Sequence, residues 1–194
     1  MPNTNRKGAK ARYRIVENVT YQLRDKEGRV KPIFVPNAVV RFLVRKGLLS
    51  PLHPQNFLFG RFRTSLTISN LVTDAGKAGV ASRINGSGGE AAFTYIAIGT
   101  GTTAAAAGDT ALQTEITTGG GARAAATASR VTTDVTNDTA RLVLTFNFTA
   151  SFAVTESGAL NASSGGVLLA RQVFSAINVV SGDSLQVTWN FDVD

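Results

Sequence analysis

The amino-acid sequence predicts a mainly β protein: an antiparallel β-sandwich, of a jelly-roll-like or Ig-like type, with one short helix and an extended basic N-terminal arm. Three observations lead to this fold class. Apolar and polar residues alternate over several short stretches of the C-terminal half, with turn signals roughly ten residues apart. One stretch in the middle of the chain has the capping residues of a helix. Basic residues are concentrated before residue 64.

The charge distribution divides the chain into two parts. Residues 1–63 contain 14 Lys and Arg against 3 Asp and Glu, whereas the remaining residues contain 6 against 10. Such a separation indicates different roles, with the basic part meeting a negatively charged partner. We therefore expect residues 1–69 to form an arm and hairpin for docking, and residues 70–194 to form the structural β-sandwich.

The first elements of the chain are expected to be extended. Residues 13–23 and 30–35 carry partly alternating apolar residues, and the turn between them contains Gly28, which can take a positive φ. Two prolines restrict the second stretch to an edge or a short strand. Residues 38–49 are apolar with interleaved arginines, and their periodicity fits either a strand or a short helix.

The best helix candidate is residues 71–84. Thr73 or Asp74 can cap its N-terminus, and small apolar residues recur on one face. Gly76 and Gly79 are expected to weaken this helix by roughly 1 kcal/mol each relative to alanine.

From residue 93 onward the pattern is that of β-strands. The alternation is clearest in residues 142–149 and 185–193, where one side is plainly apolar. Further strands are expected at the other apolar runs, residues 93–98, 131–135, 152–154 and 167–174. Turns are expected at residues 137–139, at Glu156-Ser157-Gly158 and around Asp183. Residues 114–129 are rich in Ala, Thr and Gly and are expected to form a loop, which could be flexible.

A glycine-rich stretch, GTGTTA at residues 99–104, fits the G-x-G-x-x-[G/A] pattern of dinucleotide-binding turns. Such a turn needs a following helix whose N-terminal amides meet the pyrophosphate, and the alanine run here ends after four residues. We therefore expect no cofactor, and interpret the stretch as a structural turn. Gly99 and Gly101 allow a positive φ or a close backbone approach, and Asp109 or Thr110 is expected to cap a short helical turn, 111–115.

Several kinds of chemistry are excluded or disfavoured by the residues present. The absence of cysteine excludes thiolate metal sites and a cysteine nucleophile, and a single histidine, His53, excludes a multi-histidine metal site. Nothing in the spacing of the acidic residues requires an acid–base pair, because all sit in or beside expected turns: Asp109, Glu115, Glu156 and Asp183. We expect no catalytic, cofactor-binding or metal-ligating residue. The rival hypothesis is an enzyme, either a nucleotide-dependent one that uses Gly99–Ala104 or a glycan hydrolase.

A basic cluster opens the chain, and we expect its residues to dock onto another protein: Arg6, Lys7, Lys10, Arg12, Tyr13 and Arg14. A second group of cations is interleaved with aromatic residues and adds to this surface: Arg41, Phe42, Arg45, Lys46, Phe57, Phe59, Arg61, Phe62 and Arg63. Such a composition suits an acidic protein surface, and it can also contact nucleic acid weakly. A nucleic-acid-binding module is therefore a second rival. No apolar run is long enough to insert into a membrane.

The sequence resembles structural proteins of tailed bacteriophages and prophages, of the kind labelled tail or tail-fibre proteins. The resemblance begins with NLVTDAGKAGVASRINGSGGEAAFTYIAIGTGTTAAAAGDTALQTEI, residues 70–116, and continues in TESGALNASSGG, VLLARQVF and SGDSLQVTW. It covers about residues 70–191. The recognisable pattern is N-x-x-T-x-A-G, then F-x-Y-I-A-I-G-T-G-T-T, then D-T-x-L-x-x-E-I.

The resemblance implies a virion component without catalysis. We expect it to be tail-associated, as a fibre, baseplate or adaptor component, and to assemble in multiple copies through its N-terminal arm. The expected partners are other copies of itself and other virion proteins, and the expected locations are the virion and, during assembly, the host cytoplasm. A capsid-decorating protein that bridges capsid subunits is the alternative.

Overall fold

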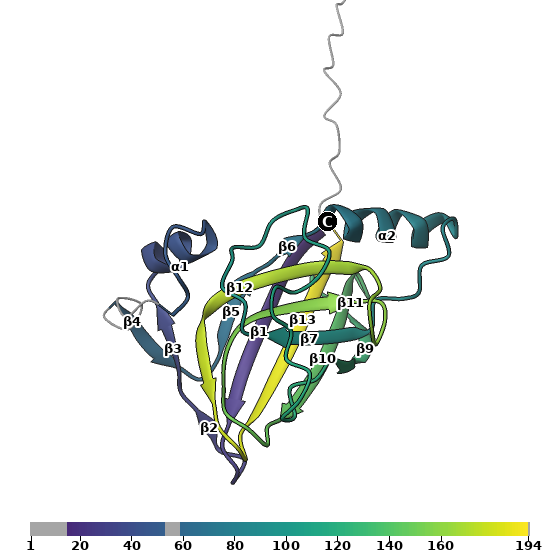
Figure 1. Ribbon diagram of the computed structural model, residues 1–194. Helices are drawn as coiled ribbons and strands as arrows, with labels where there is room; N and C mark the ends of the chain where they lie inside the picture. Colours follow the sequence, from purple (N-terminus) through teal and green to yellow (C-terminus); the bar gives the residue numbers. More distant parts are fainter. Residues whose placement is uncertain (1–14, 53–58, 194) are drawn as a thin grey trace, which may run out of the picture.

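The computed structural model describes residues 15–52 and 59–193, and these residues are mainly β, with 45% of them in strands and 12% in helices. The described strands form a six-stranded, a five-stranded and a two-stranded sheet (Figure 1). All of their pairings are antiparallel, an arrangement consistent with the predicted β-sandwich. Among these residues, neither helix has the length and apolar character needed to span a membrane.

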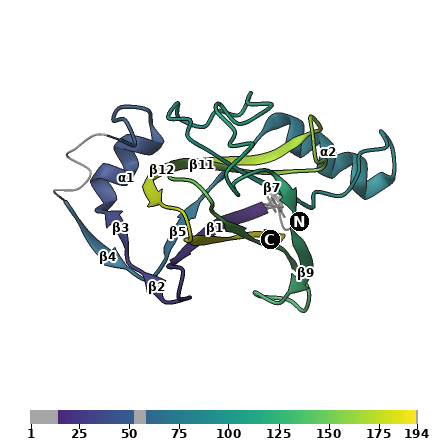
Figure 2. The same ribbon diagram turned by 60° about the horizontal axis from the view of Figure 1, so that its bottom comes forward.

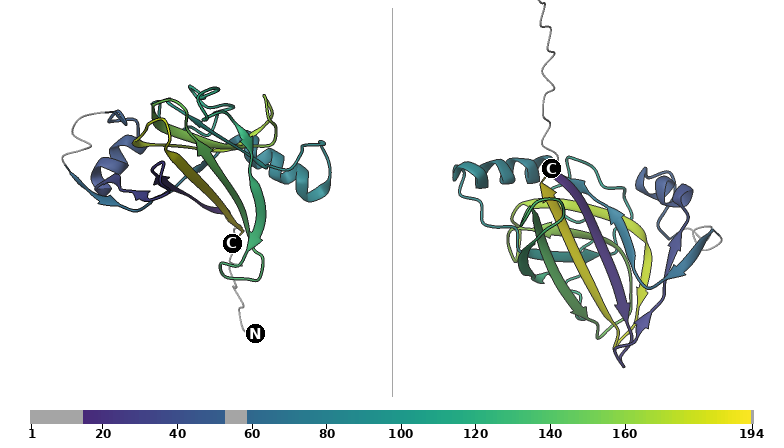
Figure 3. Two further views of the ribbon diagram at one scale, coloured as in Figure 1. Left: turned by 90° about the horizontal axis from the view of Figure 1, so that it is seen from below. Right: turned by 180° about the vertical axis from the view of Figure 1, so that it is seen from behind.

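The six-stranded sheet is built around the two long strands nearest the chain ends, which lie side by side in Figure 3. Its order is β2 (Val30–Lys31), β1 (Ile15–Arg24), β13 (Ser184–Val193), β10 (Thr139–Asn147) and β9 (Thr127–Val131), and β5 (Leu66–Ser69) also pairs with β1. In β13 buried residues alternate with more exposed ones along Leu185 to Phe191, as the sequence predicts.

The second large sheet has the order β6 (Leu71–Val72), β12 (Leu168–Val179), β11 (Phe152–Leu160), β7 (Tyr95–Gly99) and β8 (Ala124–Ala125). Its central strands do not alternate, because β11 and β12 are buried at nearly every position. The predicted turn at Glu156-Ser157-Gly158 is therefore wrong. These residues lie in the middle of β11, where Glu156 is neutralised by a buried arginine.

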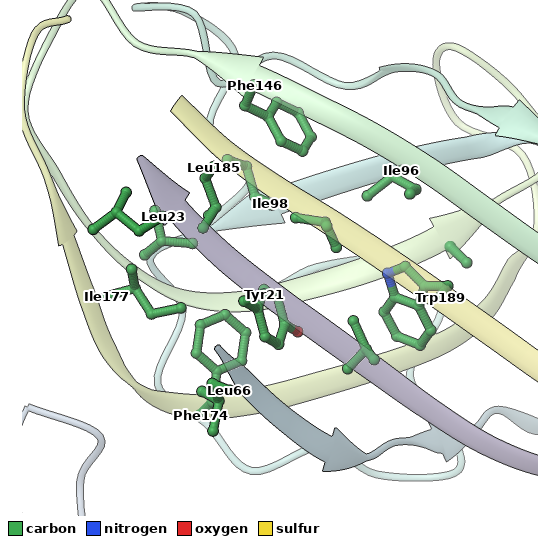
Figure 4. Packing of buried hydrophobic residues seen from close by; sticks show 14 of the residues in the cluster. Tyr21, Leu23, Leu66, Ile96, Ile98, Phe146, Phe174, Ile177, Leu185 and Trp189 are labelled. Carbon is green, nitrogen blue, oxygen red and sulfur yellow. The ribbon is translucent and has the colours of Figure 1, made fainter. Parts of the chain in front are cut away.

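The core lies between the two large sheets, whose stacking is visible in Figure 2. Aromatic residues from both sheets meet there, with the rings of Tyr21 and Phe174 4.3 Å apart (Figure 4). Within β13, the ring of Trp189 stacks on that of Phe191. The Tyr21 hydroxyl also shares a 2.6 Å hydrogen bond with Ser157 of the opposite sheet. Burial raises the pKa of Tyr21 well above its ordinary value, so this hydroxyl stays neutral and links the sheets.

The predicted hairpin is present among the described residues as far as residue 31, whereas residues 33–35 of its expected second strand pair with residues 61–63, and the hairpin is no separate arm. Strand β1 pairs with β2 across the Gly28 turn, where φ is +79°, and along its whole length with β13. Val19 and Tyr21 of β1 are fully buried in the core. Hydrophobic burial therefore places part of the segment 1–69 inside the sandwich, so the expected division at residue 69 does not separate the core from the N-terminal segment.

Residues 38–49, which fit either a strand or a helix, contain α1 (Ala38–Arg45). The Asn37 side chain caps it by accepting a 2.9 Å hydrogen bond from the Val40 amide. On either side, β3 (Ile33–Pro36) pairs with β4 (Gly60–Arg63). These elements stand beside the sandwich (Figures 1 and 2), and we call residues 33–52 and 59–63 the β3–α1–β4 lobe.

The expected helix at residues 71–84 is α2 (Asp74–Asn85), capped by the Thr73 hydroxyl, which accepts from the Gly76 amide. It begins later than predicted because the preceding residues pair with β12 as β6. Gly76 and Gly79 have a further role here, since a Cβ at either would collide with β12 or with Phe93. The glycines let α2 lie close against the sheet.

Two expectations for residues 111–129 are wrong. No helical turn forms at residues 111–115; instead Glu115 makes an antiparallel bridge with Gly99. The expected loop 114–129 contains β8 and much of β9, which pair with β7 and β10. Backbone pairing to existing strands, rather than a side-chain pattern, orders these Ala- and Thr-rich residues.

Candidate functional site

A buried ion pair lies beneath the glycine-rich stretch that resembles a cofactor motif. Glu156 of β11 and Arg171 of β12 come from neighbouring strands, and their side chains are 0% and 2% exposed. The Arg171 Nε donates to Glu156 Oε2 at 2.8 Å, and a second guanidinium nitrogen lies 2.8 Å from the same oxygen. Because β11 and β12 are central strands, this pair is held by rigid backbone on both sides.

The Glu156 carboxylate also binds the backbone of the loop that follows β7. Its Oε1 accepts from the Gly101 amide at 3.0 Å and the Thr114 amide at 2.7 Å, and its Oε2 accepts from the Gln113 amide at 3.0 Å. The carboxylate thus joins the two ends of the loop. These donors and the guanidinium replace the hydration that the carboxylate loses on burial.

The Arg171 guanidinium also holds the middle of the same loop. It donates to Asp109 Oδ2 at 2.8 Å and to the Thr103 carbonyl at 3.0 Å. Asp109 in turn accepts from the Ala106 amide at 2.9 Å. Asp109 thus accepts hydrogen bonds directly after the turn at residues 107–108, and it caps no helix.

Gln113 and Thr155 complete the attachment of this loop. The Gln113 side-chain oxygen accepts from the amides of Thr102 and Thr103, each at 2.7 Å. The Thr155 hydroxyl donates to the Gly101 carbonyl at 2.7 Å. We call these side chains, with Glu156, Arg171 and Asp109, the Glu156–Arg171 centre.

Gly99 and Gly101 are needed for close approach, which was one of the two predicted reasons for them. Neither has a positive φ. A Cβ at either position would collide with the Glu156 side chain, and at Gly99 also with the Thr114 carbonyl. The strand end and glycine turn predicted from the sequence are therefore shaped by the carboxylate beneath them.

The arrangement fixes structure and offers little chemistry. Both Glu156 oxygens accept hydrogen bonds within the chain, and the guanidinium donates to Glu156, Asp109 and Thr103. Of three hollows over the described residues, one is lined by Ala104 and Ala105 of this loop together with Arg45 and Lys46, and the other two lie beside the β3–α1–β4 lobe. Glu156, Arg171 and Asp109 line none of the three. Removing one partner of such a pair leaves an uncompensated buried charge, which costs on the order of 3–5 kcal/mol.

The four acidic residues considered from the sequence do not form one site. Glu156 and Asp109 meet at Arg171, whereas Glu115 pairs with Arg123 at 2.5 Å and Asp183 with Lys31 at 2.6 Å. Asp183 lies beside the predicted turn, where it also accepts from the Val180 amide. Among the described residues, no three His, Cys, Asp or Glu side chains gather as metal ligands would.

The predicted docking residues of the N-terminal cluster lie outside the described residues, as do His53 and Phe57: Arg6, Lys7, Lys10, Arg12, Tyr13 and Arg14. The second basic group is described, and all its members are exposed on the β3–α1–β4 lobe: Arg41, Arg45, Lys46, Arg61 and Arg63. The structure thus brings these five cations together on the β3–α1–β4 lobe.

Sequence reasoning missed Arg171 and the burial of Glu156. A signal was present, since a lone arginine interrupts the apolar run VLLARQVF. A charged residue inside a buried strand requires a partner of opposite charge, and Glu156 on the adjacent apolar stretch was the available acid.

Comparisons of the chain with protein-family models, with curated proteins and with solved structures found no match.

Proposed function

We propose that this chain is a non-catalytic structural protein of a tailed-bacteriophage particle, present in multiple copies and associated with the tail as a fibre, baseplate or adaptor component. Its sandwich is then of jelly-roll-like or Ig-like type. The basic N-terminal residues dock onto neighbouring copies or other virion proteins, and the protein passes through the host cytoplasm during assembly. Decoration of the capsid is the alternative.

The observation that carries this proposal is where the phage-like sequence pattern lies in the fold. Gly99, Gly101 and Asp109 come from its first part, and Glu156 and Arg171 from its later part. All five belong to or contact the Glu156–Arg171 centre. The pattern thus consists of residues that hold a loop to a sheet, which supports a structural role for it and a similar fold in the proteins that it resembles.

A particle-imaging experiment tests the proposal. The bacteriophage or prophage that carries the gene would be induced, and its particles purified and treated with gold-labelled antibody against this chain. We expect label at the tail, with a copy number that matches the symmetry of the labelled ring or fibre. Particles from a strain in which the gene is deleted provide the control.

The outcomes separate the two structural roles. Label spread over the head would contradict the tail assignment and support capsid decoration instead. Particles that assemble with none of the protein present, as measured by quantitative mass spectrometry, would refute a virion role altogether.

A further inference from the structure

The arginines of this protein fall into two groups that differ in their bonding. Those of the sandwich mostly bind acceptors within the chain, as Arg171, Arg123 and Arg141 do. In the part of the chain that the structure describes, the lobe arginines make no side-chain hydrogen bond or ion pair: Arg41, Arg45, Arg61 and Arg63. A guanidinium has five donors in a fixed fork, so a cluster of unbonded ones suits carboxylate acceptors from outside the chain.

The lobe contains no acidic residue. Residues 33–52 and 59–63 carry five cations, the four arginines and Lys46, and no Asp or Glu. Their mutual repulsion is therefore not relieved within the lobe. A partner of opposite charge would be attracted to this feature and held in a defined orientation.

Large apolar side chains are exposed among these cations. Helix α1 buries Val40 and Val44 but leaves Val39 and Phe42 outside. Six large hydrophobic residues of the lobe are each more than half exposed: Val39, Phe42, Leu48, Leu52, Phe59 and Phe62. Apolar residues that cluster on a surface and are surrounded by polar ones mark interaction sites, and aromatic side chains serve there as anchors.

Two hollows lie beside α1 and share Arg41. One, of about 330 Å³, lies between α1 and strands β5 and β12, with Phe42, Arg45 and Phe174 in its lining. The other, of about 350 Å³, is lined by Arg61 and Arg63 of β4. Because a cation stands between two concave surfaces, an extended segment could place acidic side chains on Arg41 and apolar ones on either side.

A second copy of this chain is a poor source of the acids. Most acidic side chains that the structure describes are already in ion pairs: Asp25, Glu27, Asp74, Asp109, Glu115, Glu156 and Asp183. Asp138 and Asp192 bind within the chain as well. We therefore take the counter-charge for the lobe to come from a different molecule.

We propose that the β3–α1–β4 lobe binds an acidic, apolar-containing segment of another protein. The aliphatic side chains favour protein over nucleic acid, because Val39, Leu48 and Leu52 offer no flat face for bases to stack on. The inference rests on the proposed function only in taking the partner to be a component of the same particle. It deepens that function by placing a docking surface on the lobe.

The test uses fluorescence anisotropy with a labelled peptide in which Glu alternates with Leu, and the same peptide with Gln in place of Glu. Arg41→Glu is expected to weaken binding of the Glu peptide by about tenfold or more, as expected when a contacting charge is reversed. Arg130→Glu is the matched control. It makes the same charge change on an exposed arginine of β9, which also lacks a described partner, and is expected to change the affinity by less than about threefold. Trp189 fluorescence checks that both variants fold.

Three results would overturn the inference: an equal loss in both variants, equal binding of the Gln peptide, or no binding of the Glu peptide. An oligothymidylate or phosphatidylglycerol vesicles that bind more tightly than the Glu peptide, and depend on Arg41, would also overturn it and assign the lobe to nucleic acid or to a membrane. The peptide assay is independent of particle imaging. If the peptide binds in an Arg41-dependent way but the particles lack the protein, the virion role is wrong and the docking surface stands. If the particles contain the protein but the peptide does not bind, the docking surface is wrong and the virion role stands.

Discussion

The buried Glu156–Arg171 pair carries a desolvation cost that its hydrogen bonds must offset. Three backbone amides and the guanidinium meet one carboxylate that is 0% exposed. Together they replace the water that both charges lose on folding. The pair also orders a loop that has little regular secondary structure of its own between β7 and β8. The pair therefore contributes to the fold by holding this loop in a single conformation.

Removing both charges should destabilise the protein by less than the sum of the two single removals. Arg171→Met leaves Glu156 buried without its cation, and we expect it to lower the free energy of unfolding by about 3–5 kcal/mol. The double variant Glu156→Gln, Arg171→Met should cost less than the sum of the single variants, because neither charge then remains unpaired. Urea unfolding of the four proteins measures this, and strictly additive costs would contradict the account of the pair.

The close approach at Gly101 gives a second prediction. Gly101→Ala places a methyl group against the Glu156 carboxyl and the Gln113 side chain, so we expect a loss of about 1–3 kcal/mol in unfolding free energy. Gly108→Ala is the control in the same loop, since its Cβ would meet nothing within 4 Å. Thermal unfolding compares the two variants, and equal midpoints would show that the loop does not need a glycine at Gly101.

At the scale of elements, the sequence predicted those whose pattern is local. The alternation in β10 and β13 and the Thr73 cap of α2 are visible in the residues themselves, and the structure confirms them. Strand β8 and the central position of β1 depend on which strands pair with them, and the local sequence does not show the pairing partners. Glu156 combines both cases. Its neighbours Ser157 and Gly158 favour a turn locally, whereas pairing with two strands places all three in β11.

The turn between β9 and β10 gives a pH-dependent prediction. The Asp138 carboxylate accepts from the amides of Val135, Thr133 and Asp134 and from the Thr139 hydroxyl. These bonds, the one from Val135 first, hold the pKa of Asp138 well below its ordinary value. A lowered folded-state pKa stabilises the protein above the unfolded pKa, which is about 3.9 for Asp, and the contribution is lost as the pH falls below it.

Asp138→Asn should therefore be less stable than the unmodified protein at neutral pH, with the difference shrinking as the pH falls through about 4. Asp134→Asn is the control, because the Asp134 carboxylate accepts no hydrogen bond among the described residues. Urea midpoints between pH 3 and pH 7 measure both variants. A difference in urea midpoint between Asp138→Asn and the unmodified protein that stays constant with pH would contradict the role assigned to the Asp138 carboxylate.

At the scale of the whole molecule, both ends of the described chain contribute to one core. Strands β1 and β13 pair over ten residues each, from Ile15↔Val193 to Arg24↔Ser184. Val19 and Val187 are both fully buried in the same cluster, and the Tyr21–Ser157 hydrogen bond joins the sheets. Although the charge split divides the sequence near residue 63, buried residues from both parts, among them Val19 and Val187, belong to the same hydrophobic cluster.

We therefore expect the chain to unfold in one cooperative transition. Val19→Ala and Val187→Ala should each lower the free energy of unfolding by on the order of 2 kcal/mol, because each leaves a cavity in the shared core. Fluorescence of Trp189, the single tryptophan, and far-UV circular dichroism should report the same midpoint in each variant. If the N-terminal segment instead folded as a separate unit, Val19→Ala would give an early circular-dichroism transition that Trp189 fluorescence does not follow. Coincident shifts in both variants require β1 to be part of the sandwich in solution.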